Sequence, residues 1–529
     1  MKSKHLALAA LVTTSSLGLA LFFVPGVRVR AANSDDEMEQ GVKEMTKVFS
    51  LVEQNFADRV SPDRAIYEGA IPGMLRTLDP HSNFLDPNEW REMQRRQRSQ
   101  YYGVGMEITV DEGKVTVNQP FPGSPAWNAG LRRGDVVAAV DGKDTTGMDT
   151  AQVANMLRGP KATPVSVTVL RQGGSEPVTV QVIRGEIQTS YVDAFWLKPG
   201  IAYLGISTFE ADNISEDMEA AFKSLGEEKM TGLVIDLRGN PGGLLNEAVA
   251  VAGHFLRNGQ TVVSHRGRAE QEEIFRAKAK PYGQRYPIVV LVDRHSASAS
   301  EIVSGALQDH DRAWVIGENT FGKGLVQGQF PLSEGAALLL TIAHYYTPSG
   351  RLIQRDYQHR SFFDYYYAGR NDGPNLQDVK ATDSGRKVYG GGGITPDEKY
   401  DPPKSNAYER RVVNSGAIFH FGSVYYHGQA PVLQDGWMPD ANLLERFKTY
   451  LTEQKVPFTD AEFAANKQWT TDQIRWELYS RALGKKMADR VTLTDDPEVI
   501  HGIGSLPKAQ ELFDSVKQVL AKRLTPNPR

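Results

Sequence analysis

The chain has 529 residues, of which 40% are hydrophobic and 23% are charged, as is typical of a soluble globular protein with about three or four domains. Its 60 basic and 64 acidic residues give a net charge of −4, and without a basic excess a nucleic-acid partner is not indicated. Cysteine is absent, which excludes disulfides, thiolate catalysis and cysteine-ligated zinc.

The N-terminus predicts an exported protein. Lys2 and Lys4 precede an apolar run over 6–24, and Val29-Arg30-Ala31 provides small residues at −3 and −1 of a cut after Ala31. We therefore expect a signal peptide over 1–31 and a periplasmic or extracellular protein. Because the apolar run approaches a spanning length, the alternative is an uncleaved anchor in the inner membrane.

The next two parts of the chain differ in pattern. Residues 34–98 carry apolar side chains at helical spacing, among them Val42, Met45 and Val48, and predict an N-terminal helical region. Residues 99–186 read as short strands separated by turns, with two short helices, and predict a compact β-rich module.

Residues 187–403 predict an α/β core, because strands alternate with helices. The runs typical of buried strands fall at 232–236, 287–292 and 313–316, and the helices between them at 245–256 and 301–308. A stretch rich in Tyr, Asp and Gly over 356–392 predicts an insertion or lid.

The last part of the chain, 404–529, is expected to be a helical C-terminal extension. Its clearest helices are expected at 443–451, 471–483 and 508–524.

A serine-rich segment follows the buried strand at 287–292. Ser296, Ser298 and Ser300 lie at the start of the next helix, where the helix N-terminus favours negative charge and free N–H groups can donate to an oxyanion. Simple helix capping also favours serine there. A serine attacks a peptide bond only if a base removes its proton, and a lysine can be that base. These arguments do not choose among the three serines.

Lys323 lies between Gly322 and Gly324, on a turn that can approach another backbone closely. A buried lysine holds its proton less tightly and can act as a general base, whereas a surface lysine in a turn cannot. The segment is not a phosphate-binding loop, because the upstream glycine spacing and the following Ser or Thr are missing.

A third segment, Asp236-Leu-Arg-Gly-Asn-Pro-Gly-Gly243, runs from a buried strand into a glycine-rich turn. Such a turn exposes consecutive backbone N–H groups, as an oxyanion hole requires. An ordinary strand–helix turn has the same composition, so this segment indicates an oxyanion hole only in combination with the serine and lysine segments.

Together the three segments resemble those of the carboxyl-terminal processing proteases, the tail-specific serine peptidases with a Ser/Lys dyad. The resemblance covers about residues 40–400 and includes Ser-Ala-Ser-Ala-Ser-Glu-Ile from Ser296 and Gly-Glu-Asn-Thr-Phe-Gly-Lys-Gly-Leu-Val-Gln ending at Gln327. It implies a multidomain α/β protein with N-terminal helices, a PDZ-like module at 99–186 and a ClpP/crotonase-like protease core at 187–403. The helical extension lies outside the resemblance.

The resemblance also implies roles for single residues. Ser298 would be the nucleophile, Lys323 the base 25 residues later, and Gln327 would orient the lysine. Asp309 occupies a position that is sometimes implicated in the family, although an acid late in a helix can be purely structural.

The oxyanion would be bound by the backbone N–H groups of Gly242 and Ala299. This chain departs from the family at Pro241, which replaces the first glycine of the usual Asn-Gly-Gly-Gly turn and removes one N–H. Gly242 and Gly243 keep theirs.

The β-rich module resembles a PDZ domain. Its peptide-binding loop would be Tyr102-Gly103-Val104-Gly105-Met106, whose N–H groups catch a peptide C-terminus while the peptide adds a strand to the sheet.

The resemblance implies a serine endopeptidase that captures apolar C-termini and requires neither a cofactor nor a metal. Two alternatives from other classes are a PDZ-based scaffold with an inactive core and a Ser/His esterase that uses His295 or His310. Residues 404–529 could mediate homo-oligomers or dock an adaptor, and 6–24 could associate with a membrane.

Overall fold

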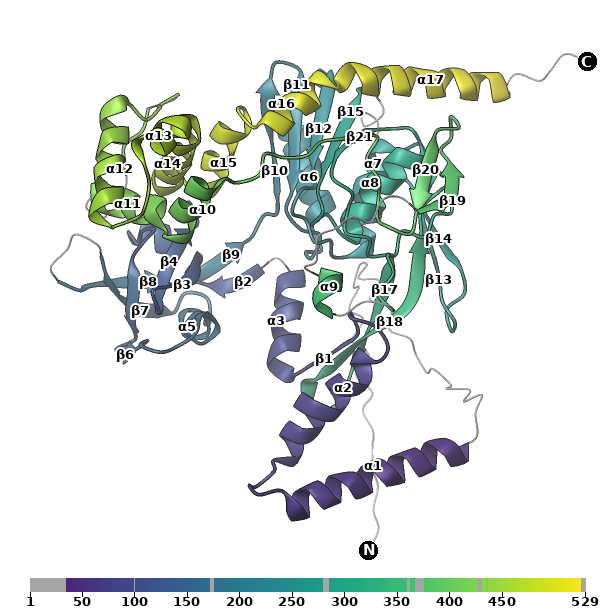
Figure 1. Ribbon diagram of the computed structural model, residues 1–529, viewed down its shortest axis with the longest axis horizontal. Helices are drawn as coiled ribbons and strands as arrows, with labels where there is room; N and C mark the ends of the chain where they lie inside the picture. The colour runs from purple at the N-terminus through teal and green to yellow at the C-terminus, as the bar shows by residue number, and fades with distance from the viewer. Residues whose placement is uncertain are drawn as a thin grey trace, which may run out of the picture. The chain divides into compact units, whose positions relative to one another are not determined.

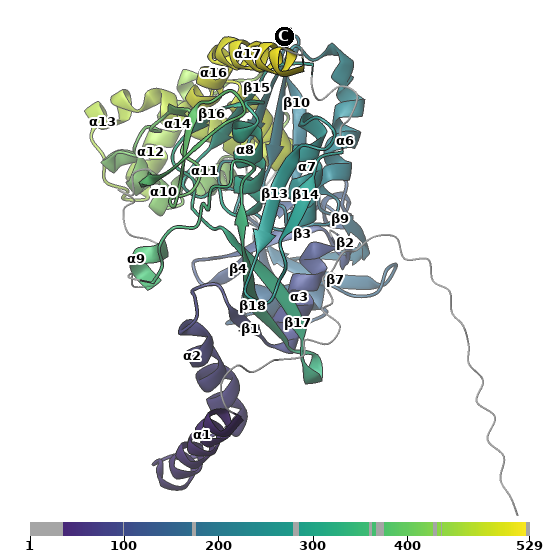
Figure 2. The same ribbon diagram turned by 90° about the vertical axis from the view of Figure 1, so that its right-hand side faces the viewer.

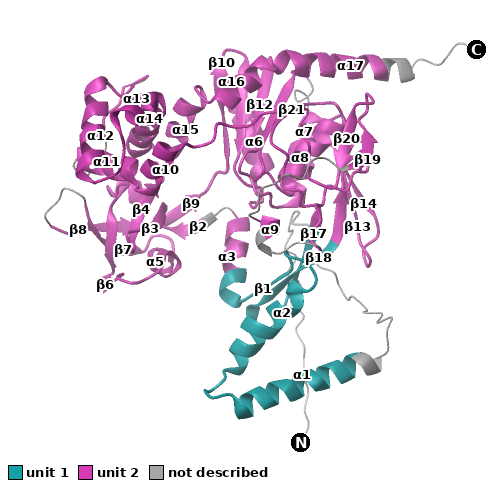
Figure 3. Cartoon of the chain, in the orientation of Figure 1, with its two compact units in different colours: residues 1–90, 326–342 teal, residues 91–325, 343–529 magenta. Residues whose placement is uncertain are grey.

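The computed structural model of the chain describes residues 35–98, 100–171, 176–278, 285–358, 362–366, 375–426, 431–434 and 436–524. The expected signal peptide and part of the expected lid lie outside these residues. Within them, no helix is long and apolar enough to cross a membrane. The chain forms two compact units, 1–90 with 326–342, and 91–325 with 343–529 (Figure 3).

The first unit holds the expected N-terminal helices and a short sheet. Its helical segments are α1 (Asp35–Asn55), a π-helical segment (Arg64–Ala70) and α2 (Ile71–Arg76). β1 (Asn83–Leu85) pairs antiparallel with the first residues of β18 (Ala337–Tyr346), and β17 (Leu325–Pro331) pairs with β18 as well. α3 (Pro87–Gln97) leads from this unit into the second.

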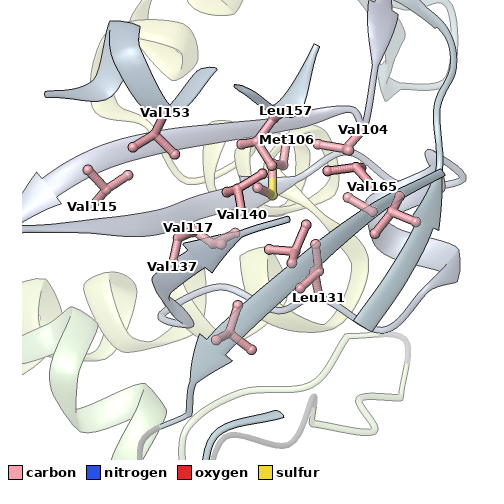
Figure 4. Close-up of a cluster of buried hydrophobic side chains, with 14 residues drawn as sticks. Val104, Met106, Val115, Val117, Leu131, Val137, Val140, Val153, Leu157 and Val165 are labelled. Carbon is pink, nitrogen blue, oxygen red and sulfur yellow. The ribbon is translucent and has the colours of Figure 1, made fainter. Parts of the chain in front are cut away.

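The β-rich module is a six-stranded sheet folded around one apolar core (Figure 4). The strands run in the order β3-β4-β5-β7-β8, with β6 paired to β5, so β3 is an edge strand. Their bounds are β3 (Met106–Asp111), β4 (Lys114–Pro120), β5 (Val136–Val140), β6 (Lys143–Asp144), β7 (Pro164–Leu170) and β8 (Val178–Ile183). The helices are α4 (Pro125–Asn128) and α5 (Thr150–Leu157), and a separate ladder joins β2 (Gln100–Gly103) to β9 (Gly185–Gln188).

The α/β core is built on a second six-stranded sheet in the order β10-β11-β12-β15-β16-β21. β10 is antiparallel to β11 and the other pairs are parallel. Their bounds are β10 (Val192–Lys198), β11 (Ile201–Ile206), β12 (Gly232–Asp236), β15 (Ile288–Val292), β16 (Trp314–Gly317) and β21 (Glu398–Lys399). β12 and β15 are buried along their whole length, as their continuous apolar runs predict.

Helices from the core segment and from the C-terminal extension cover this sheet (Figures 1 and 2). α6 (Ile214–Leu225), α7 (Leu245–Phe255) and α8 (Ala299–Asp309) pack on one another and on β10, β16 and a further strand, β13 (Thr261–Arg266). α16 (Pro497–Gly504) and α17 (Leu506–Leu524) pack on β12, β15 and β16 in a cluster that includes Val234, Leu291 and Val499.

A smaller sheet completes the core. In it, β13 (Thr261–Arg266) pairs with β14 (Glu273–Arg276) and with the last residues of β18. A separate two-stranded ladder joins β19 (Asn375–Ala381) to β20 (Lys387–Gly390). The short α9 (Phe362–Tyr366) belongs to the expected insertion.

The C-terminal extension divides into two parts. α10 (Ala407–Asn414), α11 (Ala417–Tyr425), α12 (Ala441–Glu453), α13 (Asp460–Ala465) and α14 (Lys467–Leu483) enclose an apolar core of their own. After α15 (Lys485–Leu493), the chain returns to the α/β sheet as α16 and α17. The expected fold class is confirmed, and the extension is in part a layer of the core.

A buried ion cluster joins the β-rich module to α14. The Glu477 carboxylate, 2% exposed, accepts hydrogen bonds from Arg133 at 3.0 Å and pairs with Arg481 at 2.7 Å. Arg481 also donates to the carbonyl oxygen of Arg133, and the Ser480 hydroxyl donates to the Gln119 side chain.

Glu477→Ala is expected to lower the free energy of unfolding by about 3–5 kcal/mol, because it leaves two buried guanidinium groups without their counter-ion. The matched control is Glu462→Ala in the same helices, whose ion pair with Arg411 is about one-third exposed and should be worth at most about 1 kcal/mol. Urea unfolding followed by tryptophan fluorescence measures both, since Trp476 lies beside this cluster. Equal losses in the two variants would show that the cluster is not buried as described.

Candidate active site

Three neighbouring parallel strands deliver the three predicted site segments to one edge of the sheet. β15 lies between β12 and β16, and all three run in the same direction. The glycine turn follows β12, the serine segment follows β15 and the lysine turn follows β16. Ligand and catalytic groups of parallel sheets gather at this carboxyl edge.

Backbone conformation distinguishes Ser298 from the other two serines. Ser298 is the N-cap of α8 with φ 53° and ψ −111°, a strained conformation for a residue with a side chain. Ser296 and Ser300 are fully buried, and their hydroxyls donate to the carbonyl oxygens of Leu237 and Asn240. Within the described residues, the Ser298 hydroxyl donates to no main-chain carbonyl, and the residue is only partly buried.

The glycine turn lies directly against Ser298. Gly242 has φ +96°, and a Cβ built on it would lie 2.7 Å from Ser298 Cβ and 2.8 Å from the Ala299 nitrogen. Only a residue without a side chain leaves this space open. The Gly242 N–H donates to Asn240 Oδ1 at 2.9 Å, and the Ala297 N–H donates to the Asn240 carbonyl at 3.0 Å.

A buried carboxylate ties the serine and lysine segments together. Glu301 Oε2 accepts the backbone N–H groups of Ser298 and Lys323, each at 2.8 Å. Its Oε1 accepts the Gly322 N–H at 2.7 Å and the Thr320 hydroxyl at 2.5 Å. Burial raises the pKa of the Glu301 carboxyl, and these four hydrogen bonds oppose the rise. Main-chain N–H groups can only donate, so three of the four contacts favour the ionised form, which accepts hydrogen bonds on both oxygens.

Tyr345 of β18 fastens the same two segments from another side. Its hydroxyl lies within hydrogen-bond distance of the carbonyl oxygen of Ser298, at 3.0 Å, and of that of Lys323, so its single proton is shared between them. Burial raises the pKa of Tyr345 well above its ordinary value of 10, with the charge of Glu301 as the next cause, so the hydroxyl keeps its proton. The nucleophile and the lysine turn are therefore held by two buried side chains on which the sequence analysis placed no role.

The structure also gives contacts for the other two side chains predicted for the dyad region. Asp309 is at the far end of α8, and at 1.5 Å per residue this puts it about 16 Å from Ser298. It pairs there with Arg351 at 2.5 Å and accepts the Ser349 N–H, which is a structural arrangement. Gln327 belongs to the first unit, on β17, where its amide donates to the His81 carbonyl oxygen.

The histidine alternative finds no support in the geometry. His295 is exposed on the loop before Ser298, and its ring is contacted by the Arg294 side chain. His310 follows the last residue of α8, where its two ring nitrogens lie 2.9 Å from Asp383 Oδ2 and 2.7 Å from the Thr261 carbonyl oxygen.

The first residues of the glycine turn are linked to the C-terminal extension. Arg238 donates to Asp236 at 2.6 Å, to Asp496 at 3.1 Å and to Glu498 at 2.9 Å. Burial raises the pKa of Glu498 to about 7, against the opposing charge of Arg238. The extension thus supplies two of the three carboxylates around Arg238, just before the turn reaches Ser298.

Glu301 carried a readable signal that the sequence analysis did not use. A serine followed three residues later by a glutamate is a capping box, and Ser298 and Glu301 form its second half, from the glutamate side chain to the N-cap N–H. Tyr345 gave no such signal, since it lies in an aromatic and aliphatic strand and only tertiary packing brings it to the site.

The predicted peptide-binding loop runs from the end of β2 to the start of β3. The Val104 carbonyl accepts the Ala126 N–H at 2.8 Å, and the Gly105 carbonyl accepts the Ser124 hydroxyl at 2.7 Å. Edge strand β3 is open to an added strand, and α5 packs on it. This combination of loop, edge strand and helix is the arrangement by which a PDZ domain binds a peptide.

Family models match three parts of the chain. Residues 200–358 match peptidase family S41, residues 116–171 match a PDZ domain, and residues 26–89 match the N-terminal domain of the activating protease CtpB. The first two matches coincide with the α/β core and the β-rich module described above.

Relatives match over most of their own length. A carboxy-terminal-processing protease of Bartonella bacilliformis is 37% identical over 349 residues, which cover 63% of this chain and 80% of that protein. The carboxy-terminal processing protease CtpB of Bacillus subtilis is 32% identical over 329 residues, covering 61% and 68%. A solved structure of a photosystem II D1 C-terminal processing protease is 36% identical, covers 57% of this chain and 82% of that chain, and gives a TM-score of 0.33. The chain therefore belongs to the carboxy-terminal-processing proteases of peptidase family S41, and it is a serine endopeptidase that carries a PDZ domain.

Proposed function

We propose that this endopeptidase cleaves with Ser298 as nucleophile and Lys323 as base, on proteins that its PDZ domain captures by their C-termini. The observation that carries the proposal is the shared fastening of the two segments, in which Glu301 accepts both backbone N–H groups and the Tyr345 hydroxyl shares its proton between both carbonyl oxygens. Loss of hydrolysis in Ser298→Ala and in Lys323→Ala is the test.

The proposed reaction uses two side chains of the chain and one water molecule. Neutral Lys323 takes the proton of Ser298 as Oγ attacks the scissile carbonyl carbon, and a tetrahedral oxyanion forms. The protonated lysine then gives its proton to the leaving amine, and an acyl-enzyme remains. A water molecule, deprotonated in turn by Lys323, attacks the ester and releases the new C-terminus.

Stabilisation of the oxyanion is proposed for the N–H groups of Gly242 and Ala299. The space that a Gly242 side chain would fill is bordered by the Ala297 carbonyl oxygen, Ser298 Cβ and the Ala299 nitrogen, so Gly242 and the Ala299 N–H lie close to the nucleophile. The Gly242 N–H that now donates to Asn240 must then be shared with, or given up to, the oxyanion.

Substrate capture is proposed for the loop Tyr102-Gly103-Val104-Gly105-Met106 and the free edge of β3. An apolar C-terminal side chain would enter the region between β3 and α5, whose apolar neighbours are the partly buried Ile108 and the buried Val153 and Leu157. The backbone N–H groups of the loop would hold the terminal carboxylate.

Gly105→Ala is expected to weaken binding of a peptide with a free apolar C-terminus at least about tenfold, since overpacking costs about 1–3 kcal/mol. A Cβ on Gly105 would lie 2.5 Å from Ser124 Cβ and 2.8 Å from Ile187 Cδ1. Gly113→Ala is the matched control, because Gly113 has nearly the same φ (+76° against +78°) and no atom within 4 Å of the added Cβ. Calorimetric titration in the Ser298→Ala background measures both affinities, and an undiminished affinity in Gly105→Ala would contradict the loop assignment.

Location, assembly and the finer domain limits are proposals as well. Export rests on the apolar run at 6–24, with anchoring to the inner membrane as the variant in which it is not cleaved. The domain limits at 98, 186 and 403, the orienting role of Gln327, and oligomer or adaptor contacts through 404–529 stay predictions. An inactive scaffold would bind such peptides without cleaving any protein, and a Ser/His esterase would survive Lys323→Ala.

A further inference from the structure

A buried arginine lies beside the lysine turn, and the reaction outlined above does not use it. Arg355 is 4% exposed, and its Nε and Nη2 atoms have no hydrogen-bond partner in the part of the chain that the structure describes. Burying a charged group without such partners is costly, so a position of this kind calls for an explanation.

Arg355 is fixed on the lysine turn by its backbone and by two aromatic rings. Its N–H donates to the Gly322 carbonyl at 3.1 Å. Its guanidinium carbon lies 4.0 Å from the ring centroid of Phe321 and 4.2 Å from that of Tyr365, close enough for cation–π attraction. Phe321 is itself bonded to the serine segment through its N–H and the Ser296 carbonyl.

The Glu301 carboxylate contacts the same turn. Because it accepts the N–H groups of both Gly322 and Lys323, its negative charge lies against the lysine residue. A nearby anion favours the protonated form of a lysine, which is the form that cannot act as a base. Glu301 therefore holds the two dyad segments together, but its charge by itself would favour the protonated form of Lys323.

A cation close to the same turn has the opposite effect. The pKa of Tyr365 is raised mainly by burial, and it senses both charges, with Arg355 lowering it and Glu301 raising it. The two groups thus act with opposite sign on one neighbourhood. A lysine next to another cation in a site closed to water is a known way to obtain a neutral amine.

We propose that the Arg355 guanidinium balances the buried Glu301 carboxylate and thereby lets Lys323 release its proton near neutral pH. The inference rests on the proposed function, in which Lys323 is the base, and Arg355 acts as a positioning residue that touches neither substrate nor the reacting atoms. Among the described residues, the other ionisable groups near the turn include Tyr345 from β18 and Tyr365 and Tyr366 from α9, with Asp293 and His295 on the loop before Ser298. Burial raises the pKa values of Tyr345 and Tyr365, so these two stay neutral.

The test is the pH profile of kcat/KM in the full-length protein with an unfolded protein substrate. Arg355→Met removes the charge and keeps an unbranched apolar side chain on the two rings. Its acid limb is expected to move to higher pH by about one unit, the effect of removing one nearby charge in a partly screened site. Activity at pH 7 then falls about tenfold and recovers at alkaline pH, whereas Arg355→Lys, which keeps a cation, shows a smaller shift.

Two further variants guard against a purely structural effect. Tyr365→Leu removes one of the two rings that hold Arg355, and it should shift the acid limb of the pH profile in the same direction by a smaller amount than Arg355→Met. This variant keeps the inference testable if Arg355→Met does not fold. Arg312→Met removes another buried arginine, which stacks on Phe513 and precedes β16 rather than following it, and should leave the limb in place. An equal loss at every pH in Arg355→Met, with an unmoved limb, would overturn the inference. Activity in Lys323→Ala would instead overturn the proposed function.

Discussion

Replacing Ser298 by alanine is expected to lower kcat/KM for an unfolded protein substrate by at least about 10⁴-fold, because only binding and oxyanion stabilisation remain when the nucleophile is lost. Lys323→Ala is expected to fall to the same level, since a hydroxyl without a base is a poor nucleophile at neutral pH. The double variant should be no worse than either single one, because residues that act as a unit do not lose activity additively. Release of fluorescent fragments from a labelled, unfolded protein measures all three.

Matched variants separate the chemistry from the fold. Lys323→Arg keeps the positive charge but cannot lose its proton, so it should be as inactive as Lys323→Ala. Ser296→Ala and Ser300→Ala each remove one buried hydroxyl that donates to a main-chain carbonyl, which should cost about 1 kcal/mol of stability and leave cleavage in place. Hydrolysis that survived in Ser298→Ala and was lost in Ser300→Ala would show that Ser300, and not Ser298, is the nucleophile.

The strands of the core could be predicted because their signal is local. Buried parallel strands are continuous apolar runs, and the run at 232–236 coincides with β12 (Gly232–Asp236) while that at 287–292 differs from β15 (Ile288–Val292) by one residue. Neighbouring parallel strands end at the same edge of a sheet. Because the glycine turn, the serine segment and the lysine turn each follow one of these strands, adjacency of the strands is enough to bring the three segments together.

The choice of Ser298 could not be made in the same way. Ser296, Ser298 and Ser300 share one composition and one helix start, and they differ in φ and in what their hydroxyls contact. Those differences follow from how the glycine turn of β12 packs on the loop after β15, which is a long-range contact. Resemblance to a family selected Ser298, and the strained backbone gives a physical reason for it.

The packing partners of the C-terminal helices could not be predicted for a similar reason. Its helices were predicted correctly, with the expected 508–524 falling inside α17 (Leu506–Leu524). Amphipathic spacing shows that a helix buries one face, but it does not show against which partner. The structure places α16 and α17 on the core sheet and joins α16 to Arg238, so a truncation at residue 404 would expose the apolar side chains of that sheet.

The second large effect is expected at Glu301, which is neither nucleophile nor base. Glu301→Gln keeps the size of the side chain and replaces one carboxylate oxygen by an NH₂ group. Each oxygen now accepts two donors, so the amide nitrogen must face at least one main-chain N–H group that loses its acceptor. Each hydrogen bond to a charged group contributes about 1.5–3 kcal/mol, and an orphaned buried donor costs a similar amount.

We expect kcat/KM to fall at least about 10²-fold in Glu301→Gln, because a shift of about 1 Å between the Ser298 and Lys323 segments is enough for such a loss. The free energy of unfolding should fall by about 2–4 kcal/mol at the same time. Glu247→Gln is the matched control: Glu247 is also buried on a core helix, its pKa is also raised by burial, and it accepts the Ser215 N–H at 2.7 Å, but it contacts neither dyad segment. It should lose stability and keep its activity. Kinetics at a temperature where both variants are folded separate the two effects, and a Glu301→Gln enzyme with unchanged kcat/KM would mean that the carboxylate supports the fold alone and that the dyad is positioned by other contacts.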